Sequence, residues 1–121
     1  MRALAALLLV PGLVLAAGDP LAGRKLFASC ANCHAVGLGA RHGFGPHLNG
    51  LVGRKAGSVS GYAYSPALKA SGLVWNEATL TAFLRAPAEL VPGTKMRYWG
   101  LGINDKKVAD LLAYLATQDK P

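Results

Sequence analysis

Hydrophobic residues recur with the period of an α-helix in two segments of the chain. The first segment predicts a helix from Glu77 to about Ala86, capped by Asn76 and ended by Pro87, with apolar positions Leu80, Phe83 and Leu84. The second predicts a final helix that begins after Asn104 or Asp105 and carries apolar residues at i, i+3, i+4 and i+7, namely Val108, Leu111, Leu112 and Leu115. Both patterns indicate helices that bury one face.

Two further helices are predicted from their start signals. Asp19-Pro20 places a capping side chain before a proline at the first helical position, which favours a helix from Pro20 to about Ala31. Ser65-Pro66 repeats the signal before a short helix that stops before Gly72. No segment alternates with the period of a strand. The sequence therefore predicts an all-α domain of about four helices.

Two long loops separate these helices. Residues 36–61 are rich in glycine and show no helical or alternating period, and residues 87–103 form the second loop. The backbone polar groups of such a loop still need partners inside a compact domain. We therefore expect the first loop to wrap around something other than protein.

The first 17 residues have the pattern of a secretory signal peptide. Arg2 precedes an apolar run that is broken by Pro11-Gly12 and ends in the small residues Ala16 and Ala17. The run of roughly 15 residues is shorter than the ~20 that a membrane-spanning helix needs. We expect residues 1–17 to be removed on export to the periplasm and residues 18–121 to form one domain. An uncleaved leader that anchors the chain in the membrane is the alternative.

The 121 residues are enough for one small domain, and their formal net charge of +7 predicts a basic surface. No nucleic-acid recognition motif accompanies that charge, and an exported protein seldom meets nucleic acid, so we expect no nucleic-acid partner.

Both cysteines of the chain fall in Cys30-Ala31-Asn32-Cys33-His34, the C-x-x-C-H pattern of covalent c-type haem attachment. One helical turn separates the two sulfurs, so each can form a thioether with a vinyl group of the same porphyrin, with His34 beneath the iron. A thioredoxin-like dithiol would need a βαβ setting, which is missing. A structural zinc site needs four ligands, and this motif supplies three.

The residues from Gly18 to about Asp119 resemble the class I cytochromes c, the small soluble electron carriers of respiration and photosynthesis. Besides the haem motif, the resemblance rests on four blocks and one tryptophan: Gly45-Pro46-His47-Leu48-Asn49-Gly50, Gly53-Arg54-Lys55-Ala56-Gly57, Tyr64-Ser65, Pro92-Gly93-Thr94-Lys95-Met96, and Trp75. It implies a cytochrome c-like fold of helices and long loops wrapped around one haem c, attached through Cys30 and Cys33.

The resemblance also assigns roles around the iron. It implies that His34 and Met96 are the axial ligands and that the Pro46 carbonyl accepts a hydrogen bond from His34. Met96 is the only methionine after the leader and lies in a Pro-Gly loop without helical period, where core filling suits it badly. His42 and His47 are its competitors, although structural or solvated roles fit them better. His42 lies where family members use a histidine to tie loops together.

The resemblance implies that Arg54, Tyr64 and Trp75 surround the haem propionates, and buried carboxylates need hydrogen-bond donors. A surface arginine and two core aromatics remain the alternative interpretation of these three residues. The resemblance further predicts that the two terminal helices cross where Gly23 and Phe27 meet Leu111 and Tyr114.

The chain departs from the family pattern near the expected ligand. Phe83 and Leu68 stand where mitochondrial members carry a tyrosine and a buried asparagine, so we expect a drier pocket and an altered reduction potential. Arg97 adds a charge beside Met96, and Tyr98-Trp99 adds large rings near the expected haem edge.

The resemblance implies a one-electron carrier that transforms no substrate and is therefore no enzyme. We expect a monomer with only peripheral membrane contact, which shuttles electrons from a quinol:cytochrome reductase to an oxidase or a photosynthetic centre. Lys55, Lys95 and Arg97 are the candidates for steering it toward acidic docking surfaces. The alternatives are a haem peroxidase or gas sensor with an open sixth position, and a thiol protein without haem.

Overall fold

The computed structural model describes residues 18–98 and 102–118, so the leader and Trp99 lie outside the described residues. Its helices are α1 (Pro20–Phe27), α2 (Pro66–Ala70), α3 (Glu77–Arg85), α4 (Pro87–Leu90) and α5 (Asp105–Ala116). In this part of the chain the extended pairing is limited to one isolated bridge between Lys55 and Val74. The predicted all-α class is confirmed.

The predicted capping side chains close the starts of four helices. Asp19 accepts a hydrogen bond from the backbone of α1, and Ser65 and Asn76 do the same for α2 and α3. For α5 the cap is Asn104, whose Oδ1 accepts from the Lys107 amide at 2.9 Å. Each cap satisfies a backbone amide that has no partner inside its helix. Since only a few residue types can do this, the helix starts can be predicted from the sequence.

Two predicted boundaries are wrong. Helix α1 ends at Phe27 rather than near Ala31, because amides 28–30 bond to carbonyls three residues back instead of four, which tightens the chain into successive turns. Helix α4 lies in the segment predicted as a loop. It begins at Pro87, and its four residues are too few to display a hydrophobic period, so the domain has one helix more than the sequence predicts.

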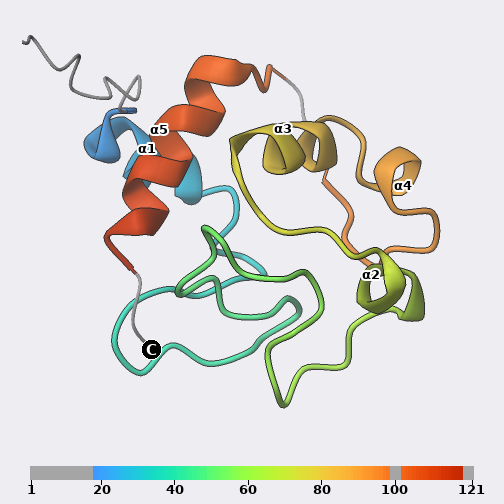
Figure 1. Cartoon of the computed structure of the whole chain (residues 1–121). Coiled ribbons are helices and arrows are strands. Elements are labelled where there is room, and N and C mark those ends of the chain that lie inside the picture. The colour runs from blue at the N-terminus through green and yellow to red at the C-terminus, as the bar shows by residue number, and fades with distance from the viewer. Residues whose placement is uncertain (1–17, 99–101, 119–121) are drawn as a thin grey trace, which may run out of the picture.

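Helices α1 and α5 cross, and α5 packs on α3, which packs on α4 (Figure 1). At the crossing an added Cβ on Gly23 would overlap the Asp110 carbonyl, so the glycine permits the close approach. The Phe27 and Tyr114 rings lie 5.7 Å apart between centroids. The predicted crossing of the terminal helices is therefore present, and Val108 and Leu115 of α5 are fully buried behind it.

The long loops of residues 28–65 lie below α1, α3 and α5 in Figure 1 and close the domain on that side. Asn49 holds them together: its side chain is buried and exchanges two hydrogen bonds of 2.8 Å with the backbone of Gly37. Among the described helices none combines the length and the apolar character needed to cross a bilayer.

We predict that Gly23→Ala lowers the free energy of unfolding by about 1–3 kcal/mol, because the new methyl group must push α1 away from the α5 backbone. Denaturant unfolding followed by circular dichroism measures this loss. The control is Arg24→Ala on the exposed side of the same helix, expected to stay within about 0.5 kcal/mol of the wild type. Equal stabilities of the two variants would contradict the close-packing role of Gly23.

Candidate functional site

A cavity of about 410 Å³ lies between the helices and the long loops. Its walls include apolar side chains from α1, α3 and α5, among them Phe27, Phe83 and Leu115. All of the residues predicted to hold a cofactor also line it: Cys30, Cys33, His34, Pro46, Arg54, Tyr64, Trp75 and Met96. The fold therefore brings together residues that are spread over 67 positions of sequence.

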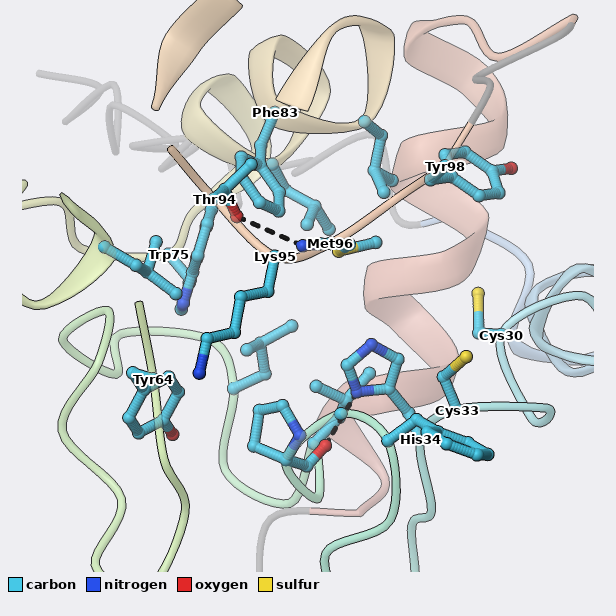
Figure 2. Close-up of a pocket in the computed structure, with 18 of the residues that line it drawn as sticks. Cys30, Cys33, His34, Tyr64, Trp75, Phe83, Thr94, Lys95, Met96 and Tyr98 are labelled. Atoms are coloured by element: carbon cyan, nitrogen blue, oxygen red, sulfur yellow. Dashed lines mark hydrogen bonds between the residues drawn. The ribbon is translucent and has the colours of Figure 1, made fainter. Parts of the chain in front are cut away.

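The two cysteines and His34 share the turns that follow α1. The amides of Cys33 and His34 both donate to the Cys30 carbonyl, at 3.1 and 2.9 Å. This turn puts both sulfurs on one side of the cavity, as Figure 2 shows. Burial raises the pKa of the Cys30 thiol, so the thiol is neutral at pH 7.

The ring of His34 is fixed by its neighbours in the second loop. Nδ1 donates to the Pro46 carbonyl at 2.7 Å, which leaves Nε2 without the ring proton and available as a ligand. Gly45 lies against the ring, where a Cβ would come 2.7 Å from Nδ1. Burial lowers the pKa of His34, which favours the neutral ring that binds metals.

Met96 faces His34 from the other side of the cavity (Figure 2). It lies in a loop whose position is set by its neighbours. The Met96 amide donates to Thr94 Oγ1 at 3.4 Å, and Lys95 Nζ donates to the Ala63 carbonyl at 2.9 Å. The loop that carries Met96 is thereby tied to the loop before α2.

Polar groups gather on the side of the cavity away from the cysteines. Arg54 Nη1 donates to the carbonyls of His47 and Asn49, at 2.9 and 3.0 Å, and burial lowers its pKa. The Trp75 amide donates to the Arg54 carbonyl at 3.0 Å, so the two residues are held together. The Tyr64 hydroxyl accepts from the Val59 amide at 3.3 Å, which leaves its proton free to donate elsewhere.

His42 and His47 do not line the cavity. Their rings stack on each other, 5.0 Å apart and 9° from parallel. His42 Nε2 donates to the Ser60 carbonyl at 3.0 Å and so joins two loops. His47 Nδ1 accepts from the Asn49 amide at 3.3 Å.

The expected departures from the family pattern also lie at the cavity. Phe83 and Leu68 both line it, and the Phe83 ring packs on Trp75 at 5.1 Å between centroids. Of the three cations predicted to steer partners, Lys95 and Arg97 are at the cavity and Lys55 is not among its lining residues.

The site fits a flat, mostly apolar group that carries one metal ion. The cavity volume is in the range of cofactor pockets, two thiols lie at one edge, and an imidazole and a thioether face each other across it. Within residues 18–98 and 102–118, no three His, Cys, Asp or Glu side chains are grouped to hold a metal by themselves. A haem supplies the remaining iron ligands from its own porphyrin, so the donor set suits haem.

Sequence reasoning missed several residues that shape the site. Phe44, Leu48 and Leu51 line the cavity from a loop without hydrophobic period, so no pattern marks them. The stacking of His47 on His42 was also missed. Their spacing of five residues matches no regular element, and only the folded loop brings the rings together.

Comparison with known proteins gives one consistent result. The family model described as Cytochrome c matches residues 21–119. Cytochrome c2 of Rhodoblastus acidophilus is 52% identical over 100 residues, which are 83% of this chain and 92% of that protein. Cytochrome c-550 of Nitrobacter winogradskyi is 46% identical over 103 residues, covering 85% and 94%. The solved structure of cytochrome cH from Methylobacterium extorquens aligns with a TM-score of 0.74 at 50% identity, over 83% of this chain and 99% of that one.

We predict that stability falls as the pH drops below about 6.5, the ordinary pKa of histidine. Burial and the charge of Arg54 lower the pKa of His47, so the unfolded chain binds this proton first. The loss continues until the pH reaches the lower pKa of the folded state. Denaturant unfolding between pH 8 and pH 5 measures the slope.

His47→Asn is the matched variant for this slope. An asparagine can still accept from the amide two residues ahead, as His47 does from Asn49, but it cannot titrate. The variant is expected to lose part of the pH dependence while remaining folded at pH 8. An unchanged slope would show that another group carries it.

Proposed function

The chain belongs to the cytochrome c family, and from this premise we propose that His34 and Met96 are the two axial ligands of its haem iron. The protein is an electron carrier with one covalently attached haem c. The observation that carries the ligand assignment is the placement of His34 and Met96 on opposite sides of one cavity, with Cys30 and Cys33 at its edge.

When bound, the haem supplies one-electron chemistry by cycling between ferric and ferrous iron. Cys30 and Cys33 hold it through two thioethers, and the 2.7 Å bond to Pro46 orients His34. Met96 would fill the sixth position, and hydrogen bonds of Lys95 and Thr94 tie down its loop just before the ligand. A His/Met pair gives a higher reduction potential than two histidines.

Arg54, Tyr64 and Trp75 are proposed to surround the propionates. Arg54 keeps donors beyond those used by the His47 and Asn49 carbonyls, and the Tyr64 proton is free. Buried carboxylates need such donors. Phe83 and Leu68 also line the cavity and offer no hydroxyl or amide to Met96, which supports a drier environment for the ligand.

The protein is proposed to act in the periplasm, with residues 1–17 as the export signal and residues 18–121 as the working domain. With both axial positions filled by side chains it transforms no substrate and is no enzyme. The relatives described above are named as cytochromes, which gives no support to a peroxidase or a gas sensor. Its proposed partners are a membrane reductase and an oxidase or photosynthetic centre with acidic docking surfaces.

We predict that Met96→Ala opens the iron, because no other side chain of the 92–98 loop supplies a sulfur ligand. The near-infrared methionine-to-iron band of the oxidised protein should vanish, the reduction potential should drop, and peroxidase activity should appear. The control is Pro92→Ala, an exposed change in the same loop, which should keep the band. An unchanged spectrum and potential in Met96→Ala would refute the axial assignment.

Partner steering is tested by two exposed cations that differ in position. We predict that Arg97→Gln, at the cavity, slows association with an acidic redox partner at low ionic strength, and that salt abolishes the difference. Lys55→Gln removes the same charge away from the cavity and is expected to change the rate less. Stopped-flow rates over a salt series measure both. Equal losses would show that net charge, rather than position, steers the encounter.

A further inference from the structure

An unbroken line of hydrogen bonds runs from His34 through the second loop to Ser60. His34 Nδ1 donates to the Pro46 carbonyl at 2.7 Å. The amide of the same peptide group, His47 N–H, donates to His42 Nδ1 at 3.1 Å. His42 Nε2 then donates to the Ser60 carbonyl at 3.0 Å. We call these three bonds the His34–Ser60 relay.

All three bonds point in the same direction. A carbonyl cannot donate, so His34 Nδ1 and His42 Nε2 carry their ring protons, and His42 Nδ1 must accept. The Pro46–His47 peptide group and the His42 ring therefore each accept at one end and donate at the other. Hydrogen bonds in such a line polarise one another and become stronger than isolated ones.

We propose that His42 is a positioning residue for electron transfer, acting on His34 through the Pro46–His47 peptide group. When His42 Nδ1 accepts from the His47 amide, it draws electron density toward the Pro46 oxygen, and this oxygen then binds the His34 proton more strongly. A stronger bond at Nδ1 makes the ring a more basic ligand at Nε2. A more basic ligand favours ferric iron, so the relay lowers the reduction potential. The inference rests on the proposed role of His34 as an axial ligand.

The residues around His42 hold its ring in the orientation that the relay requires. Its ring stacks on His47 and touches the Tyr62 ring, with centroids 5.0 and 5.5 Å away. Arg54 donates to the His47 carbonyl at 2.9 Å and so fixes the backbone just beyond the shared peptide group. His42 therefore cannot turn without breaking two hydrogen bonds and a stack.

The test compares the reduction potential of the complete haem protein with that of three variants at pH 8. His42→Leu removes the acceptor and is expected to shift the potential upward. His42→Gln restores an acceptor and a donor and should bring the potential back toward the wild type. His47→Phe keeps both the main-chain amide of the relay and an aromatic ring to stack on His42, and should leave the potential close to the wild type. The methionine-to-iron band should persist in all three.

The sign of the shift separates the relay from a merely structural role. If His42 only braces the loops, its loss lets water reach the site, which stabilises the more highly charged ferric form and shifts the potential downward. A downward shift or no shift in His42→Leu overturns the proposal. A wild type without the methionine-to-iron band would instead refute the proposed function, before any variant is compared.

A second measurement needs no variant and decides the matter if His42→Leu fails to fold. Nitrogen NMR of the labelled wild-type protein reports which ring nitrogen of His42 carries the proton. The relay requires the proton on Nε2 and a hydrogen-bonded Nδ1 without one. The opposite tautomer at pH 8 would break the line at His42 and overturn the proposal.

Discussion

The structure depends on an apolar cavity of about 410 Å³ between the helices and the loops. A domain of this size has little interior, so a cavity of this volume takes a large part of it. The loop side chains Leu48 and Leu51 turn toward that space from segments without regular structure. Attachment of the haem through Cys30 and Cys33 therefore completes the core as well as the site, so folding and function rest on the same contacts.

The walls of this cavity are mostly apolar, with hydrogen-bond donors at a few positions. Tyr64 and Trp75 lie on the side away from the cysteines (Figure 2), and Arg54, whose carbonyl accepts from the Trp75 amide, brings a positive charge to the cavity. Phe83 and Leu68 line the cavity with Met96 and bring no polar group to it. A flat group with acidic substituents at one edge can enter in one orientation only without burying an unpaired charge.

The two proposed ligands lie on irregular backbone, yet hydrogen bonds hold the segments that carry them. His34 is fixed by the Pro46 carbonyl, whose peptide group is itself held by His42. The Met96 loop is held through Lys95 and Thr94. Rigid ligands suit electron transfer, because little has to move when the charge on the iron changes. Irregular segments can supply this rigidity because their polar groups are satisfied by one another rather than by a helix or sheet.

The sequence by itself determined the class of the protein, the helix starts and the identity of the attachment site. Caps such as Asn76, periods such as that of α5, and the spacing of Cys30, Cys33 and His34 are local features that act within one turn of the chain. Tertiary structure alone decided the early end of α1, the formation of α4, the stack of His42 on His47, and which cations lie at the cavity. The turns that end α1 and the four residues of α4 are too short to form a period. The other features depend on contacts between residues far apart in the chain, which leave no local pattern.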